Sequence, residues 1–458
     1  MMDLVGEFVL LGLRFDRLIE GFVDAYTGDP ALRRQVDNEP RPDPAVLARR
    51  AAQLRAELPA AGLAQPRARF LDAHLTALEC SGRVLAGQPV GFVAEVAAYF
   101  DVAIEPGDPE VYHQAHAEIA QLLPGSDPLA ARLAAYRTRD EIAPERLDTA
   151  VQALSSALRD RVRTGFGLPP QETVQYEVVT DKPWSGFNYY LGDFRSRVAI
   201  NADLGHRMAN LPHLVAHESY PGHHTEHCRK EAGLVRTQHH TEQTIFLVNT
   251  PQCLMAEGLA DLGLLAAVGP GWGLWAAEIL GDVGLRMDGE LAERLEAAAA
   301  GLLGVRQDAA LMLHDQHADP ADVLAYLQRW LLVGEPRARQ MVRFLADPLW
   351  RAYTTTYVEG YRLLRSWLDA RPSVQSLGQR YLRLLDEPLI PSVVRAELIH
   401  LGGYLPRTAT PRYRAVAAGR AGRVSPREAL IVSVVDRAGK PPTASTGGPA
   451  PGSRGRSS

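Results

Sequence analysis

The sequence has little cysteine, no long apolar run and no excess of positive charge, and each shortage excludes a class of protein. Near the N-terminus, Glu7 interrupts the apolar residues and further charged residues follow at once, which argues against a secretory signal and a membrane span. The few cysteines are widely spaced and odd in number, so they form no disulfide framework and suit a reducing compartment: Cys80, Cys228 and Cys253. We therefore expect a cytoplasmic protein that does not enter membranes.

The balance of charge also limits the partners. The 49 Lys and Arg residues are outnumbered by 54 Asp and Glu residues, which gives a formal net charge of −5. A protein that binds nucleic acid through its phosphates needs an excess of basic side chains, so we expect no nucleic-acid partner. With 46% apolar and 22% charged residues, the chain of 458 residues is typical of a soluble globular protein with a large core.

Helical periodicity dominates most of the chain and divides it into three regions. Residues 1–165 are a succession of Ala-, Leu- and Arg-rich helices, and residues 166–403 return to helices after a short β-rich stretch. Residues 404–458 form a basic tail that ends in Pro, Gly and Ser, and we expect it to be largely disordered. We interpret the tail as a solvated appendage, with contact to an anionic partner as the alternative.

Local signals within these regions mark both strands and helix starts. β-branched and aromatic residues predict short strands at about 173–180, 186–191 and 196–201. The fold class is therefore mainly α (α+β), a large helical domain with a small antiparallel β element ahead of the helix that follows residue 210. Asp-Pro pairs predict helix starts, because Asp caps a helix and Pro suits its first turn: Asp108-Pro109, Asp127-Pro128 and Asp319-Pro320.

Histidines are concentrated in one short segment. Eight of the fourteen fall between residues 206 and 240, and the segment contains the sequence HESYPGHH at 217–224. In an H-E-x-x-H helix, two histidines one turn apart bind Zn²⁺ while the glutamate acts as general base on the metal-bound water. Here Pro221 occupies the position expected for the second histidine, so the usual motif is absent.

The Pro-Gly pair offers a way to restore the geometry. Pro221 breaks or bulges a helix, and Gly222 tolerates the backbone angles that such an interruption requires. Two residues looped out at this point would return His223 to the place of the second ligand. On an undistorted helix His224 would share the face of His217 instead. We favour His223 as the ligand, and we expect His224 to support the site from beside it.

A carboxylate from a later helix would complete the ligand set. Glu257 and Asp261 lie four residues apart in an otherwise apolar helical stretch, CLMAEGLADLGLL. A carboxylate that faces a core is costly unless it is paired or binds a metal. We predict Glu257 as the third ligand, Asp261 as the acceptor for the outer N–H of a ligating histidine, and Glu218 as the general base.

With these residues identified, the sequence resembles the bacterial domain-of-unknown-function 885 family of zincin-like peptidases, over roughly residues 170–400. The matching segments are HESYPGHH at 217–224, EGLA at 257–260 where the family usually has E-G-W-A, DAALMLHDQHADPADVLAYL at 308–327 and YVEGYRLLRSWL at 357–368. The resemblance implies a zincin-like fold, zinc as the metal and a peptide substrate. It also implies Tyr357 as a donor to the oxyanion, with His314 as another candidate.

The leading hypothesis is a zinc-dependent hydrolase that cleaves peptide bonds. A non-catalytic binding or scaffold protein with a structural or vestigial metal site is the alternative, and the displaced second histidine motivates it. The same residues could also hydrolyse esters or other amides. The strands ahead of the metal helix could align an extended substrate, with Asn188, Tyr189 and Tyr190 facing the cleft, or they could form a purely structural hairpin.

Overall fold

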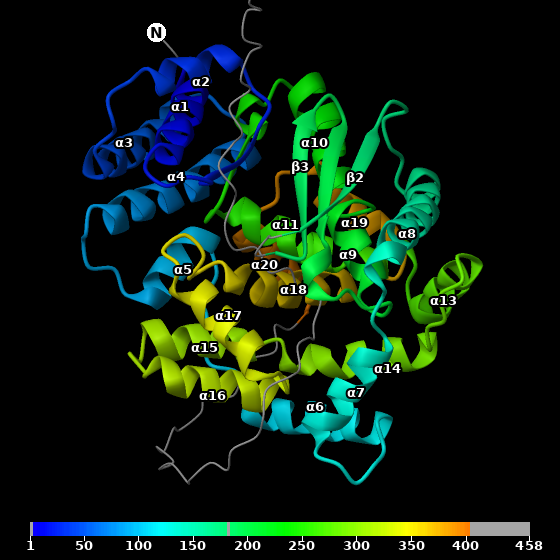
Figure 1. Cartoon of the computed structure of the whole chain (residues 1–458). Coiled ribbons are helices and arrows are strands. Elements are labelled where there is room, and N and C mark those ends of the chain that lie inside the picture. The colour runs from blue at the N-terminus through cyan, green and yellow to red at the C-terminus, as the bar shows by residue number, and fades with distance from the viewer. Residues whose placement is uncertain (1–2, 181–183, 404–458) are drawn as a thin grey trace, which may run out of the picture.

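The computed structural model describes residues 3–180 and 184–403, which are mostly helical (Figure 1). The predicted fold class, mainly α with a small β element ahead of the histidine-rich segment, is confirmed. The predicted tail, residues 404–458, lies outside the described residues. Within the described ranges, no helix combines the length and the hydrophobicity needed to cross a bilayer.

The first part of the chain contains one short strand, β1 (Val23–Tyr26), among helices. Those helices are α1 (Leu4–Asp16), α2 (Pro30–Asp37), α3 (Pro44–Glu57), α4 (Gln65–Leu85), α5 (Phe92–Phe100), α6 (Pro109–Leu122), α7 (Leu129–Arg139) and α8 (Pro144–Gly165). The predicted cap at Asp108 is present, because its side chain accepts a hydrogen bond from the backbone of Glu110. At the Asp127-Pro128 pair the prediction is off by one residue, since Pro128 is itself the cap and α7 begins after it.

The β element follows α8 and has the predicted strand positions. Its strands are β2 (Thr173–Val179), β3 (Gly186–Gly192) and β4 (Arg195–Asn201), in the order β2-β4-β3. The expected antiparallel pairing holds for β3 and β4, which are joined by Asp193 and Phe194, both with positive φ as a tight hairpin turn requires. β2 pairs with the other side of β4 and runs parallel to it. The sheet is therefore mixed.

Helices return after the sheet and continue to the end of the described chain. They are α9 (Leu211–Glu218), α10 (His223–Lys230), α11 (Pro251–Asp261), α12 (Gly263–Ala267), α13 (Trp272–Asp282), α14 (Gly289–Ala299), α15 (Val305–His314), α16 (Pro320–Leu331), α17 (Glu335–Ala346), α18 (Thr354–Asp369), α19 (Leu377–Asp386) and α20 (Pro391–His400). One more strand, β5 (Ile245–Leu247), precedes α11. The predicted start of α16 is confirmed, because the Asp319 side chain accepts from the backbone of Ala321.

The N-terminal helices and the later helices share one hydrophobic core. A single cluster of buried side chains extends from α1 to α20 and crosses residue 165 without a break. β1 pairs antiparallel with β5, and Arg67 of α4 forms an ion pair with the fully buried Glu242 at 2.5 Å. Tyr112 of α6 donates a hydrogen bond to Asp308 of α15 at 2.7 Å. The first 165 residues therefore pack as an integral part of the structure that carries the candidate site.

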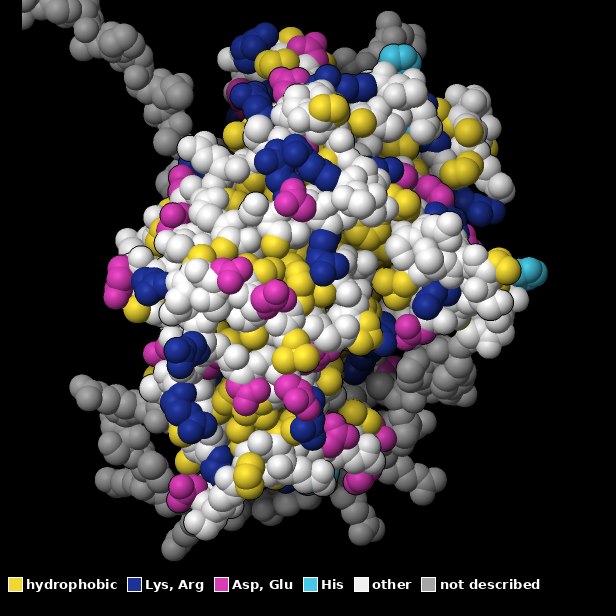
Figure 2. Space-filling view, turned by 90° about the vertical axis from the view of Figure 1, so that its right-hand side faces the viewer, with side chains coloured by type: hydrophobic (Ala, Val, Ile, Leu, Met, Phe, Trp, Pro, Cys, Tyr) yellow, Lys and Arg dark blue, Asp and Glu magenta, His cyan; other side chains and the backbone are white. Residues whose placement is uncertain are grey.

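Three helices lie at the centre of this arrangement. α1–α4 lie on one side of the molecule, the sheet with α8 and α10 lies on the other, and α9, α11 and α18 lie between them (Figure 1). On the face drawn in Figure 2, basic and acidic side chains are interspersed, so this face presents no broad area of one charge. His217 on α9 and Glu257 on α11 are thus carried by the central helices, and His223 begins the adjoining α10.

Candidate metal centre

The Pro-Gly pair ends one helix and starts another. α9 ends at Glu218 and α10 begins at His223, so Pro221 breaks the helix and does not merely bulge it. Gly222 packs directly on the end of α9, where a Cβ atom would lie 1.9 Å from the carbonyl oxygen of His217. Only glycine fits this contact. The chain therefore turns back tightly enough to place the first residue of α10 beside the last turn of α9.

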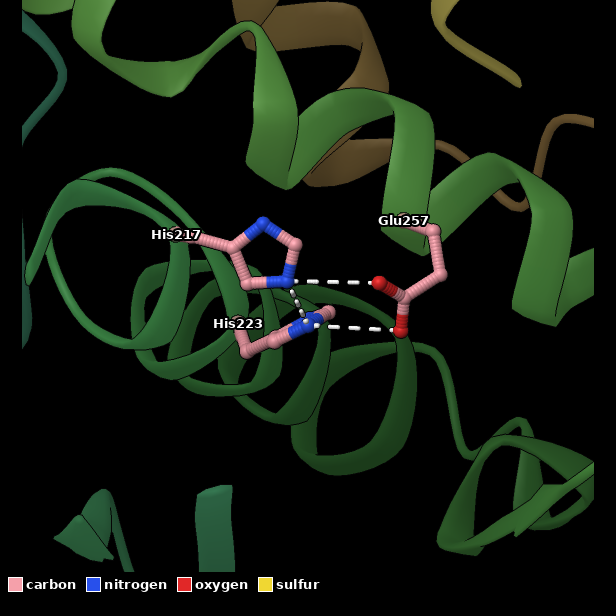
Figure 3. A group of neighbouring side chains, drawn as sticks. All are labelled: His217, His223 and Glu257. Atoms are coloured by element: carbon pink, nitrogen blue, oxygen red, sulfur yellow. Dashed lines mark hydrogen bonds and ion pairs between the residues drawn. The ribbon is translucent and has the colours of Figure 1, made fainter. Parts of the chain in front are cut away.

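This turn brings together three side chains that could bind a metal. The Nε2 atoms of His217 and His223 are 3.1 Å apart, with their rings almost perpendicular. Glu257 of α11 places Oε2 3.2 Å from His217 Nε2 and Oε1 3.6 Å from His223 Nε2. Figure 3 shows both imidazoles directed toward this carboxylate. All three residues are buried, with exposed fractions of 3%, 4% and 1%.

The donor atoms have the spacing that a small divalent ion requires. Zn²⁺ binds histidine nitrogen and carboxylate oxygen at about 2.0–2.2 Å in a tetrahedron, which separates two donor atoms by about 3.3 Å. The observed separations of 3.1, 3.2 and 3.6 Å lie on either side of that value. Two histidines and a glutamate are also a ligand set of catalytic zinc sites, which keep one position open. His217, His223 and Glu257 together could therefore hold a metal ion.

Asp261 supports the first of these ligands. Its Oδ1 lies 2.8 Å from His217 Nδ1, one turn after Glu257 on the same helix. Burial alone would lower the pKa of His217, but the hydrogen bonds to Asp261 and Glu257 outweigh burial and raise it to about 10. A metal ion bound at His217 Nε2 would leave the contact of Nδ1 with Asp261 in place.

Tyr353 contacts the carboxylate ligand and was not predicted from the sequence. Its hydroxyl donates a hydrogen bond of 2.8 Å to Glu257 Oε1 from the residue that precedes α18. This contact depends on a close crossing of α11 and α18, where a Cβ atom on Gly258 would lie 2.4 Å from the carbonyl carbon of Gly360. One signal in the sequence could have pointed to Tyr353: it lies four residues before Tyr357, so on a helix the two tyrosines would share one face.

The two candidate oxyanion donors, Tyr357 and His314, have different surroundings. Tyr357 is buried one turn after Tyr353, with its ring centroid 5.6 Å from that ring, and it lines a small cavity together with Arg306. His314 has Nε2 2.6 Å from the carbonyl oxygen of Leu345. The structure therefore places His314 in a helix-packing contact, and the role predicted for Tyr357 remains a prediction.

His224 is not part of the metal-binding group. Consecutive residues on a helix point about 100° apart, and His224 therefore faces the sheet when His223 faces Glu257. Its Nδ1 lies 2.8 Å from Ser196 Oγ on β4, and its Nε2 lies 3.1 Å from a carboxylate oxygen of Glu172. The structure thus brings His223, and not His224, to the other ligands, and it does not place His224 beside them as a supporting residue.

Glu172 organises a second buried cluster behind the turn. It accepts hydrogen bonds from Tyr220 at 2.7 Å and from Arg159 at 2.6 Å, in addition to its contact with His224. Burial opposes ionisation of Glu172, but the hydrogen bonds from His224, Arg159 and Tyr220 outweigh it and lower its pKa to about 2. Glu172 thereby ties α8 and the start of β2 to the turn that carries Tyr220. No motif in the sequence marked it.

The predicted base, Glu218, is the last residue of α9, and its side chain lies against the edge strand β3. It is fully buried, and a Cβ atom on Gly186 would lie 3.4 Å from its Oε1. Asn188 of β3 donates a hydrogen bond of 2.6 Å to the backbone carbonyl of Glu218. Tyr190 instead bonds Glu231, and Tyr189 lies under the guanidinium of Arg197. Asn188 therefore contacts the HExxPGHH segment directly.

Comparison with known proteins gives only distant similarity. No protein-family model matches the chain, and no curated protein matches it. Among solved structures, a proposed lipoprotein from Colwellia psychrerythraea has a TM-score of 0.47 and 16% identity, covering 78% of this chain and 66% of that one. A proposed lipoprotein of unknown function from Shewanella oneidensis has a TM-score of 0.47 and 12% identity, covering 81% and 75%.

A third solved structure is an M32 carboxypeptidase from Deinococcus radiodurans R1, with a TM-score of 0.37 and 13% identity, covering 88% of this chain and 95% of that one. The chain spans about two thirds of the length of the first of these proteins and three quarters of the second. None of the three similarities is strong enough to carry an activity to this chain. The function proposed below rests on the geometry of His217, His223 and Glu257.

Proposed function

We propose that this protein is a zinc-dependent hydrolase of peptide bonds, related to the zincin-like peptidases of the domain-of-unknown-function 885 family. The observation that supports it is the convergence of His217, His223 and Glu257 at spacings suited to one ion, with Asp261 holding the outer nitrogen of His217. Glu218 follows the first ligand directly in the chain. This pairing of a ligand with an adjacent buried carboxylate is the arrangement used for water activation.

The chemistry divides between the ion and the chain. A zinc ion in this site supplies Lewis acidity, which lowers the pKa of water and polarises a carbonyl group. Glu218 accepts a proton from the attacking water as the water oxygen bonds to the carbonyl carbon of the substrate. When the C–N bond breaks, Glu218 returns the proton to the leaving amine. Asn188 holds the backbone of Glu218 in place throughout.

The edge strand β3 offers a means of aligning the substrate. It is the outer strand of the sheet on the side of α9, and its first residue, Gly186, lies against Glu218. An extended peptide can add to a sheet edge through backbone hydrogen bonds. A peptide bound along β3 would pass beside the predicted base.

A non-catalytic metal site is the second candidate, and the burial of the group favours it. The three ligands and Glu218 are each at most 4% exposed, whereas a catalytic site must admit water and substrate. Such a site would stabilise the packing of α9, α10 and α11 without supporting turnover.

Substitution of Glu218 by Gln separates the two candidates. We expect one zinc per chain in both the wild type and Glu218→Gln by elemental analysis, with hydrolysis of a quenched peptide library by the wild type alone. Glu177→Gln, on the exposed side of β2, is the control and should behave as the wild type. Bound zinc without hydrolysis by the wild type would favour the structural site, and full turnover by Glu218→Gln would refute the role of the base.

A further inference from the structure

A cavity of about 300 Å³ adjoins the candidate metal centre. It is bordered by α9, α14, α15 and α18, and both His217 and Asp261 contribute to its wall. Sites for small molecules typically have volumes of about 300–1,000 Å³, so this space suits one amino-acid residue and not a long peptide. The cavity meets the candidate centre at His217 and Asp261, so a group bound in it lies beside the first of the proposed ligands.

Most of the cavity wall is apolar. Leucines line it, together with Trp272 at the start of α13. The leucines include Leu214, Leu262, Leu265, Leu302 and Leu303. Such a wall favours an aliphatic or aromatic side chain, because transfer of apolar surface out of water is favourable. The cavity also has charged groups, and their distribution determines what else a ligand must carry.

The basic groups come from α15 and α18. Arg306 of α15 is buried, and burial lowers the pKa of its guanidinium, although arginine keeps its charge at neutral pH. Tyr361 and Arg365 line the same cavity from α18, and Arg365 Nε is 2.7 Å from Asp369. Arg306 is therefore the buried cation of this wall, and its planar guanidinium suits a carboxylate.

The acidic groups of the cavity are engaged or lie on another wall. Asp261 is bonded to His217. Glu293 of α14 accepts hydrogen bonds of 2.7 and 3.0 Å from backbone N–H groups at the start of α13. Burial lowers the pKa of His213 on α9, whereas the negative charges of Glu296, Asp261 and Glu293 raise it. Glu296, which is also on α14, therefore lies near α9. The wall formed by α15 and α18 is thus the one that suits an anion.

We propose that this cavity receives the C-terminal residue of a peptide substrate, with its free carboxylate on Arg306 and an apolar side chain against the leucines. This inference rests on the proposed function and specifies its substrate class. Hydrolysis then adds water across the last peptide bond: the shortened peptide gains a carboxylate, and the terminal residue leaves as a free amino acid. Arg306 contacts the substrate and determines which bond is cut.

Matched substrates test the proposal on the zinc-loaded protein. We expect N-benzoyl-Gly-Leu to be hydrolysed with a kcat/KM at least about 10–100-fold above that of its C-terminal amide, because an ionic hydrogen bond is lost in the amide. N-benzoyl-Gly-Lys should also be a poor substrate. Arg306→Gln should abolish the preference for the free acid, and Arg306→Lys should retain part of it. Arg339→Gln, which changes an exposed arginine of α17 outside the cavity, is the control that should keep the preference. Zinc content and melting temperature should match the wild type in each variant used.

A binding measurement makes the test independent of turnover. In calorimetry with the Glu218→Gln protein, N-acetyl-leucine should bind and N-acetyl-leucinamide should not, and adding Arg306→Gln should remove the binding. Equal hydrolysis of acid and amide would overturn this inference and leave the proposed function standing. A preference for the C-terminal lysine would overturn the apolar assignment of the wall. Binding that depends on Arg306 without any hydrolysis would retain the carboxylate site and refute the hydrolase.

Discussion

Replacing Tyr353 by Phe should weaken metal binding through the carboxylate ligand. The change removes one hydroxyl, the donor of the 2.8 Å hydrogen bond to Glu257 Oε1. It keeps the aromatic ring, which packs against Trp350 with centroids 5.1 Å apart. A hydrogen bond to a charged group contributes about 1.5–3 kcal/mol. Groups that orient metal ligands typically change metal affinity by about 10–100-fold when mutated, so we expect a loss of at least about tenfold.

The assay is competition for zinc against a chromophoric chelator at neutral pH. Tyr357→Phe, the same change one turn further along α18, is the matched control and should retain the zinc affinity of the wild type. If Tyr357 also donates to the oxyanion, its variant should lose turnover while keeping the metal. This combination separates a role on the ligand from a role on the substrate.

Two results would refute the reasoning on Tyr353. Equal zinc affinity for Tyr353→Phe and the wild type, with both folded by melting temperature, would mean that the hydroxyl does not support Glu257. An equal loss in Tyr353→Phe and Tyr357→Phe would point to a general loosening of α18 instead.

Three further changes have definite expected outcomes. Asp261→Asn should weaken zinc binding by about tenfold and lower the pKa of His217 from about 10 in the metal-free protein, as an NMR titration would show. Gly258→Ala should destabilise the fold by about 1–3 kcal/mol in urea unfolding, because its methyl group would lie 2.4 Å from Gly360. Glu172, with a folded pKa of about 2 against an ordinary 4.5, adds stability above pH 4.5 that is lost as the pH falls toward 2. Glu172→Gln should cost about 3 kcal/mol at neutral pH and flatten this acid dependence in unfolding measurements; an unchanged acid limb would contradict it.

The sequence predicted those features that depend on residues close together in the chain: the helix break, the pair of acids on one helix and the strand positions. A proline four residues after His217 cannot continue a helix, and this favoured His223 over His224 before any geometry was known. Two acids one turn apart on an apolar helix pointed to Glu257 and Asp261. The strand positions followed from β-branched and aromatic content and agree with the structure to within about one residue.

Contacts between distant segments were beyond such rules. Tyr353 contacts Glu257 because Gly258 of α11 and Gly360 of α18 allow these two helices to pack closely. The sequence around either glycine does not indicate that the two helices are in contact. His224 contacts Glu172, which directly precedes the strand predicted at 173–180 and carries no signal of its own in the sequence. The parallel pairing of β2 with β4 is a matter of topology, which strand propensity does not encode.

The pairing of β1 with β5 has a consequence for the order in which this protein assembles. β1 leaves the ribosome long before β5, and β5 leads directly into the helix that carries Glu257. Contacts between segments so far apart in the chain form slowly, so we expect the ion to be acquired late, after the early helices have docked. A fragment that starts at residue 166 would leave β5 with a bare edge and its neighbours with uncovered apolar faces, and we expect it to aggregate.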